Sequence, residues 1–230
     1  MISSKPSQYI KGWVEFYKLR FKVTPDVLIP RPETELLVDA VISFARTSLT
    51  RLTILDLGTG SGNIAISLAS HLRGVNVNII ATDISKKALK VAKQNAKLHG
   101  VLDKIEFFQS NLLDCRALRA RNDKDMVIVT NLPYIPSARI PYLDSSVKDF
   151  EPLVALDGGV DGFDLYRKLF AQIKEKGWEP KLIVGEIDYT HGQLAVDEAY
   201  KYFPKAQVEV KTDLFKKQRI LKITQQVSQQ

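Results

Sequence analysis

The stretch Ile54-Leu55-Asp56-Leu57-Gly58-Thr59-Gly60-Ser61-Gly62 decides the fold, because it joins an apolar run to a helical pattern through a glycine-rich turn. Residues 53–57 predict a buried strand, and residues 63–72 repeat apolar side chains at helical spacing. Glycines let the backbone turn tightly and approach a ligand that a Cβ atom would block. In an open α/β sheet, ligands bind at this place, beyond the carboxyl end of a strand. We therefore expect a ligand site over this turn.

Strand-like and helical patterns alternate through the rest of the chain. This alternation predicts an α/β fold with a mostly parallel, Rossmann-like sheet and helices on both faces. The last two strands follow each other without a helix, so we expect an antiparallel C-terminal hairpin at the edge of a seven-stranded sheet. Besides residues 53–57, the expected strands are 75–84, 104–109, 126–130, 181–187, 206–211 and 219–223; the further helices are 85–99, 161–176 and 193–202.

The chain, at 230 residues, is long enough for one ordinary domain with a short extra segment. We expect residues 1–30 to form a β-hairpin and linker, residues 31–224 the catalytic domain, and the polar residues 225–230 a disordered tail. The run Pro30-Arg31-Pro32-Glu33-Thr34-Glu35 is expected to open a helix. Prolines suit a first helical turn, and acidic residues there interact favourably with the helix dipole.

Composition excludes several classes of protein. The 33 Lys and Arg against 26 Asp and Glu give a formal charge of +7, which would suit an anionic partner, but the excess is spread along the chain like an ordinary solvated surface. No apolar run reaches the roughly 18 residues of a membrane span, and no signal-peptide core is present. The single cysteine, Cys115, excludes internal disulfides, and the three histidines are far apart. We expect a cytoplasmic protein with no membrane partner and no metal.

The glycine spacing separates two possible nucleoside cofactors. A nicotinamide dinucleotide fingerprint requires glycine at its sixth position, where this chain has Asn63. Asp83 ends the next expected strand, about twenty residues further on, and can accept hydrogen bonds from ribose hydroxyls. This carboxylate indicates a nucleoside without choosing between the two cofactors. The Asp-x-Gly-x-Gly-x-Gly form, however, resembles motif I of the S-adenosylmethionine methyltransferases.

The tetrapeptide Asn131-Leu132-Pro133-Tyr134, after expected strand 126–130, carries the most chemical information. It resembles the (Asp/Asn)-Pro-Pro-(Tyr/Phe) motif of enzymes that methylate a nitrogen conjugated to a π-system. The lone pair of such a nitrogen is delocalised, and acceptors at Asn131 Oδ1 and the Leu132 carbonyl can orient its NH2 group. Pro133 adds no competing N–H, and Tyr134 offers a stacking face. The competing interpretation is an ordinary Asn-x-Pro turn.

The tetrapeptide alone does not identify the acceptor, because Asn-Leu-Pro-Tyr also occurs in ribosomal RNA adenine dimethyltransferases. Those enzymes usually add a C-terminal helical domain, for which no residues remain here, and they lack the Pro-Arg-Pro-Glu-Thr-Glu run. Several stretches together resemble the release factor glutamine methyltransferase family, also called the HemK family. The stretches are residues 21–35, 131–136, 150–159, 161–167, 213–214 and 219–221.

The resemblance implies a class I S-adenosylmethionine methyltransferase that acts on the N5 atom of the glutamine in a Gly-Gly-Gln loop of peptide chain release factors. It implies a protein partner and a monomer without stable nucleic acid binding. Family members typically carry an N-terminal helical domain, whereas this sequence begins almost at the connecting hairpin, as expected either of a minimal form or of part of a longer protein. The alternatives are an adenine N6-methyltransferase acting on RNA or DNA and a catalytically silent binding module. The residues implied for the cofactor are Asp56, Gly58, Thr59, Gly60, Ser61, Gly62, Asp83, Ile84, Asn111, Leu112 and Asn131; those for the acceptor are Arg31, Glu33, Thr34 and the tetrapeptide Asn131, Leu132, Pro133 and Tyr134.

Overall fold

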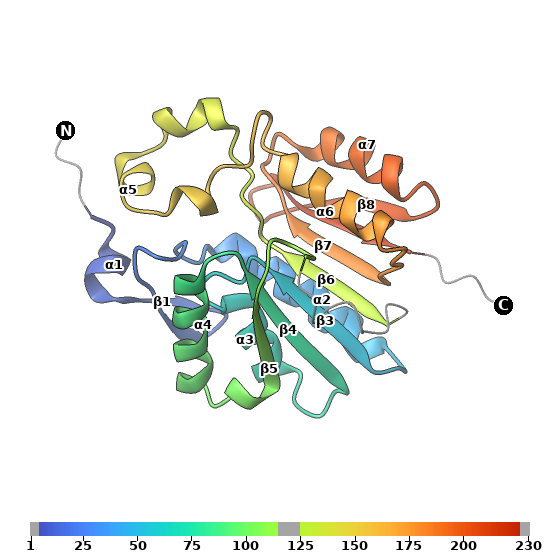
Figure 1. The fold of residues 1–230 in the computed structure, drawn as a ribbon, viewed down its shortest axis with the longest axis horizontal. Helices are drawn as coiled ribbons and strands as arrows, with labels where there is room; N and C mark the ends of the chain where they lie inside the picture. Colours follow the sequence, from blue (N-terminus) through green and yellow to red (C-terminus); the bar gives the residue numbers. More distant parts are fainter. Residues whose placement is uncertain (1–4, 115–124, 226–230) are drawn as a thin grey trace.

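The computed structural model describes residues 5–114 and 125–225, and its centre is a seven-stranded sheet (Figure 1). The spatial order is β5-β4-β3-β6-β7-β9-β8. The pairs from β5 to β7 are parallel, whereas β9 runs antiparallel to both β7 and β8. This arrangement confirms the expected sheet and its C-terminal hairpin. The strands are β3 (Leu52–Leu57), β4 (Val77–Asp83), β5 (Ile105–Gln109), β6 (Met126–Thr130), β7 (Leu182–Glu186), β8 (Gln207–Thr212) and β9 (Gln218–Thr224).

Helices cover both faces of the sheet (Figure 1). Successive strand residues point to opposite faces, so Ile54 packs in the core on one side and Leu55 in the core on the other. Each face is therefore buried against its own helices, as the alternating pattern predicts. The first side holds α2 (Glu35–Thr47), α3 (Asn63–His71) and α4 (Lys86–Leu98), and the second holds α6 (Asp164–Glu175) and α7 (Gly192–Tyr202).

Local side-chain contacts set where two of these helices begin. Ser85 caps α4, since its hydroxyl accepts a hydrogen bond from Ala88 N at 3.2 Å. The helix expected from residue 161 begins at Asp164 instead. The preceding residues form a turn, in which Asp161 Oδ1 accepts from Phe163 N and Gly162 has a φ of 83°. A side-chain hydrogen bond of this kind competes with the helix and delays its start.

The N-terminal segment packs against α4. A short helix, α1 (Ser7–Lys11), precedes an antiparallel hairpin of β1 (Trp13–Phe16) and β2 (Leu19–Lys22). The buried Asn95 side chain on α4 pairs with the Lys22 backbone, accepting from its N–H at 2.8 Å and donating to its carbonyl at 3.0 Å. Residues 226–230 of the expected tail, and Cys115, lie outside the described residues.

Residues 137–160 form a separate layer of short turns after β6, which the sequence analysis did not assign to elements. It contains η4 (Ser137–Tyr142), α5 (Ser145–Lys148) and η5 (Leu153–Ala155). Remote contacts hold it, because the Arg31 guanidinium pairs with both carboxylate oxygens of buried Glu151, at 2.6 and 2.8 Å.

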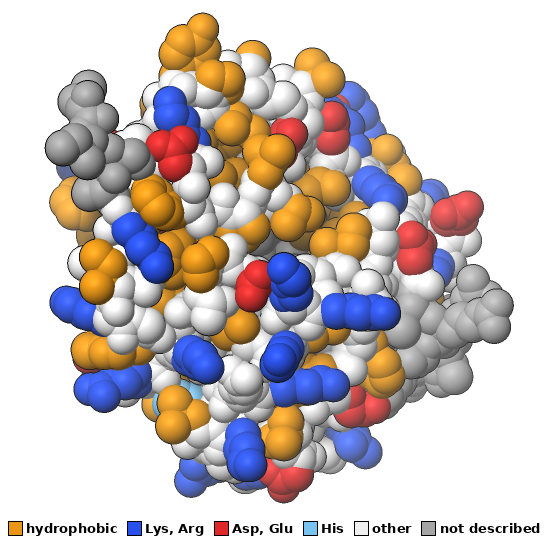
Figure 2. Space-filling model, turned by 60° about the vertical axis from the view of Figure 1, so that its left-hand side comes forward, with side chains coloured by type: hydrophobic (Ala, Val, Ile, Leu, Met, Phe, Trp, Pro, Cys, Tyr) orange, Lys and Arg blue, Asp and Glu red, His pale blue; other side chains and the backbone are white. Residues whose placement is uncertain are grey.

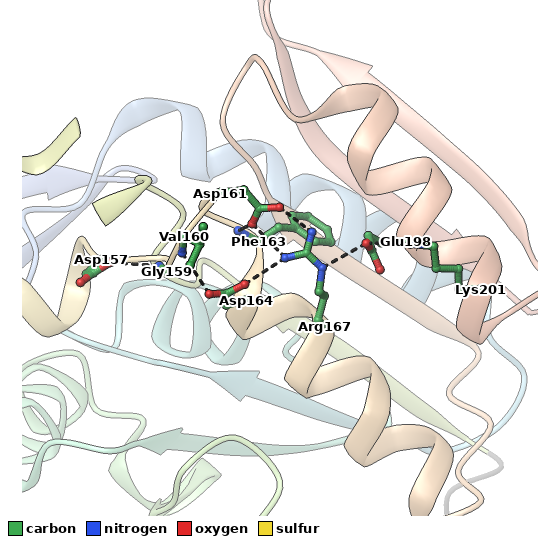
Figure 3. A network of polar contacts seen from close by, with 9 residues as sticks. All are labelled: Asp157, Gly159, Val160, Asp161, Phe163, Asp164, Arg167, Glu198 and Lys201. Carbon is green, nitrogen blue, oxygen red and sulfur yellow. Dashed lines mark hydrogen bonds and ion pairs between the residues drawn. The ribbon is translucent and has the colours of Figure 1, made fainter. Parts of the chain in front are cut away.

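Arg167 on α6 anchors the end of this layer (Figure 3). Its guanidinium pairs with Asp161 on the preceding turn, with Asp164 at the start of α6 and with Glu198 on α7. Several charges in one network hold a loop better than an isolated surface pair does. Asp157, at the start of the same loop, accepts from Ser137 Oγ and Gly159 N, which forms a turn at residues 157–159.

The described helices include none that is both long and apolar enough to cross a bilayer. The same residues contain no cluster of three His, Cys, Asp or Glu side chains that could hold a metal ion.

Candidate active site

A cavity lies at the carboxyl ends of β3, β4, β5 and β6, where the parallel topology predicts a ligand. The loops after these four strands form most of its wall. The N-terminal linker and the layer of residues 137–160 complete it. Its lining includes Val27, Leu28, Pro30, Thr34, Gly58, Thr59, Gly60, Ser61, Asn63, Asp83, Ile84, Ser85, Ser110, Asn111, Leu112, Asn131, Leu132, Pro133, Pro152, Val154 and Leu165.

The three glycines of the turn have two different tasks. Gly58 and Gly60 have φ values of 73° and 54°, which favour glycine, and both border the cavity. A Cβ atom on Gly58 would meet nothing closer than Leu132 Cδ2 at 3.7 Å, an ordinary van der Waals distance, so the left-handed φ rather than crowding favours glycine at this position. A Cβ atom on Gly62 would lie 2.8 Å from Ile66 Cδ1. Gly62 therefore allows close packing beneath the cavity rather than forming its wall.

Asp56 lies beneath the glycine turn and holds it to α3. This residue is fully buried, and its Oδ2 accepts hydrogen bonds from Thr59 Oγ1 at 2.6 Å and from Ala65 N at 3.1 Å. Its Oδ1 is buried without a partner among the described residues. Burial raises the pKa of Asp56 to about 7, although the two hydrogen bonds oppose the rise. Asp56 thus supports the cofactor loop from below and does not line the cavity.

Asp56→Asn should remove a pH dependence of folding stability. Between the ordinary pKa of 3.8 and about 7, the unfolded chain releases the Asp56 proton while the folded chain keeps it. The folded state then binds more protons, so stability falls as pH rises through this window. The stability of the Asn variant relative to the wild type should therefore increase across the window in paired denaturant titrations. A difference that stays flat would show that the folded protein carries an ionised Asp56 throughout.

Asp83 ends β4 beside the glycine turn. Its carboxylate accepts from Gly60 N at 2.9 Å through Oδ2 and from Ser85 N at 2.8 Å through Oδ1. Burial raises the pKa of Asp83, and these backbone hydrogen bonds oppose the rise. Each oxygen retains a second lone pair for a ribose hydroxyl. The neighbouring Ile84 is 49% exposed and presents an apolar surface on which a base can lie.

Asn111 and Leu112 close the cavity after β5. Leu112 has a φ of 54°, unusual for a side chain of this kind, and its carbonyl accepts from Ser110 Oγ at 2.7 Å. The turn buries Leu112 and leaves Asn111 exposed. A nucleoside therefore finds apolar surface here together with a polar side chain.

The tetrapeptide after β6 contacts Glu186, the last residue of β7. Asn131 Nδ2 donates to Glu186 Oε2 at 3.1 Å, and the Tyr134 hydroxyl donates to Oε1 at 2.9 Å. Among the described residues, none donates to Asn131 Oδ1, so this oxygen can accept from a group in the cavity. Leu132 is buried in the core, and Pro133 borders the cavity. Burial raises the pKa of Tyr134 well above its usual range, and the adjacent Glu186 adds to the rise.

The Pro-Arg-Pro-Glu-Thr-Glu run borders the cavity with Pro30 and Thr34. Thr34 is buried, borders the cavity and donates from Oγ1 to Glu186 Oε2 at 2.6 Å. Arg31 points to Glu151 instead and holds the layer of residues 137–160 in place. Neither Arg31 nor Glu33 borders the cavity.

The structure adds functional candidates that the sequence analysis did not identify. Glu186 is the most important of them. Its position at the carboxyl end of the expected strand 181–187 is the sequence signal by which it could have been identified. The apolar wall from Val27, Leu28, Pro152 and Val154 had no such signal, because these residues reach the cavity only through tertiary packing.

Comparisons with known proteins identify the family of this chain. A family model described as a methyltransferase domain matches residues 49–177. The fold and the site define a Rossmann-like class I S-adenosylmethionine-dependent methyltransferase. The chain is 39% identical over 220 residues to the release factor glutamine methyltransferase of Lactococcus lactis, spanning 96% of this chain and 77% of that protein. The corresponding Bacillus subtilis protein is 38% identical over 219 residues, spanning 94% and 74%. The chain therefore belongs to the release factor glutamine methyltransferase family.

A solved structure shares the fold. The hMettl16 catalytic domain, in complex with a MAT2A 3'UTR hairpin, superimposes with a TM-score of 0.71 at 14% identity. The alignment covers 92% of this chain and 76% of that chain. At this identity the likeness concerns the fold alone.

Proposed function

We propose that this enzyme transfers a methyl group from S-adenosylmethionine to the side-chain amide nitrogen of the glutamine in the Gly-Gly-Gln motif of a peptide chain release factor. The observation that carries the proposal is the Oδ1 of Asn131, which accepts from none of the described residues and lies at the cavity, in a chain whose relatives are named for this acceptor. The primary amide of a glutamine side chain offers the two N–H donors that an acceptor site of this kind would bind.

The residues present fit the cofactor. Gly58 and Gly60 bring bare backbone to the cavity, and Asp83 is placed to bind a ribose. When bound, S-adenosylmethionine supplies a methyl group on a positively charged sulfur. Asn131 Oδ1 and the Leu132 carbonyl would each accept an N–H of the acceptor amide and hold its lone pair toward the methyl group. Such positioning can account for up to roughly 7–11 kcal/mol of a reaction barrier.

The surface around the cavity suits a protein acceptor. In Figure 2 hydrophobic side chains gather over the upper part of this face, and Lys and Arg gather below. The exposed apolar residues of the layer above the cavity include Tyr142, Leu153, Val154 and Val160. Exposed apolar groups of this kind mark protein contacts more often than contacts with a phosphate backbone. The names of the relatives also do not favour the adenine N6 alternative. The proposal further implies a cytoplasmic monomer that does not bind nucleic acid stably.

The purified protein should bind S-adenosylmethionine and its demethylated product, but not NAD. Asp83→Ala should weaken this binding by about 1.5–3 kcal/mol, because hydrogen bonds to a charged group are lost. Calorimetry measures both constants. Asp125→Ala is the matched control. Asp125 precedes β6 and pairs with Lys181 at the amino ends of the strands, away from the cavity. Tight NAD binding would overturn the cofactor assignment, and equal affinities of the two variants would remove Asp83 from the site.

A further inference from the structure

Glu186 joins the two most informative motifs of the sequence through one buried carboxylate. The side chain is 1% exposed and stands behind the cavity wall. Its Oε1 accepts from the Tyr134 hydroxyl at 2.9 Å, and its Oε2 accepts from Thr34 Oγ1 at 2.6 Å and Asn131 Nδ2 at 3.1 Å. Asn131 Nδ2 also lies 3.1 Å from Thr34 Oγ1, which closes the network.

The charge environment of Glu186 is unusual for a purely structural residue. In the part of the chain that the structure describes, no Lys or Arg forms an ion pair with it, and its hydrogen-bond donors are neutral. Burial raises the pKa of Glu186, whereas hydrogen bonds from Thr34 and Tyr134 and the positive charge of nearby Arg219 oppose the rise. Burying a carboxylate without a directly paired cation costs free energy, and apolar packing would stabilise a purely structural position better. Such groups concentrate at functional sites.

We propose that Glu186 is a positioning residue, which fixes the end of the Asn131 amide that faces the acceptor. An ionised carboxylate only accepts hydrogen bonds, so Asn131 must turn its NH2 group toward Glu186. Thr34 reinforces this choice, because its hydroxyl hydrogen is committed to Glu186 and its oxygen can only accept from Asn131. Asn131 Oδ1 then faces the cavity. The reversed amide would place a donor against the NH2 donors of the substrate. This inference rests on the proposed function.

Glu186→Gln tests the proposal with almost no change of shape. The new amide donates at one end, so Asn131 can reverse and lose its acceptor orientation. We expect kcat for release factor methylation to fall about 10²-fold, the cost of a small misplacement at a reacting centre. The KM for the release factor and the calorimetric affinity for the demethylated cofactor should change little. Glu198→Gln is the matched control, because its carboxylate pairs with Arg167 and Lys201 away from the cavity (Figure 3). Its kcat should stay normal.

A reciprocal exchange separates positioning from structural support. Asn131→Asp alone places two carboxylates together and should be slow. Combined with Glu186→Gln, it restores a donor–acceptor pair with opposite polarity, and the second aspartate oxygen still faces the cavity. The double variant should therefore turn over faster than either single variant. A double variant no faster than the slower single variant, or a near-normal kcat for Glu186→Gln, overturns the inference.

Thr34→Val keeps the test decisive if Glu186→Gln loses cofactor binding and so fails to report on positioning. Removing the hydroxyl that restricts Asn131 should lower kcat while KM stays similar. Normal turnover of this variant overturns the inference. A wild-type enzyme without activity on the release factor would instead overturn the proposed function, so the two failures are distinguishable.

Discussion

Asn131→Ala should reduce turnover by about 10²-fold or more, because it removes a contact that aligns the acceptor nitrogen at the reacting centre. The interaction matters most while the methyl group is in transfer, so kcat should fall far more than cofactor affinity. Steady-state kinetics with a purified release factor, together with calorimetry of the demethylated cofactor, measures both effects.

Asn131→Asp refines this expectation. It keeps an acceptor oxygen, as related enzymes with Asp at this position do, and should retain part of the activity. The structure explains why the retention should be incomplete, since the new carboxylate would face Glu186, and like charges at this distance resist joint ionisation. Near-normal turnover of Asn131→Ala with normal folding would show that the amide-positioning mechanism is wrong.

Much of the fold follows from local sequence patterns. The strand expected at residues 126–130 has these bounds in the structure, and the helix expected at residues 85–99 is α4, capped by Ser85. Such elements are strongly periodic, and their boundaries depend on nearby residues. The layer of residues 137–160 has no such periodicity. It is held by the remote pair of Arg31 and Glu151 and by the Arg167 network, which no local pattern reveals.

The residues of the site divide in the same way, into those that local sequence patterns predict and those that depend on remote contacts. Gly58, Gly60, Asp83 and Asn131 lie together at the cavity because the carboxyl ends of parallel strands meet at one edge of the sheet. Leu132 seemed to matter only for its carbonyl, yet its side chain is buried in the core. Glu186, Thr34 and the direction of Arg31 depend on contacts across more than fifty residues, which spacing alone does not encode.

Replacing the glutamine of the release factor's Gly-Gly-Gln loop should abolish methyl transfer. The proposed acceptor site would offer two hydrogen-bond acceptors, Asn131 Oδ1 and the Leu132 carbonyl, and the NH2 group of glutamine can satisfy both. A glutamate at that position lacks both donors when ionised and would leave the acceptors unpaired. Scintillation counting of the methylated protein measures the loss, and circular dichroism checks that the altered release factor remains folded. Labelling that persists after the replacement would contradict the assigned acceptor atom.

The most direct test offers methyl-labelled S-adenosylmethionine to the purified enzyme with a folded release factor and ribosomal RNA in the same tube, followed by mass-spectrometric mapping of the labelled atom. The proposed function predicts label on the side-chain amide nitrogen of the Gly-Gly-Gln glutamine, with the RNA unlabelled. Label on adenine N6, with the release factor unmodified, would contradict it.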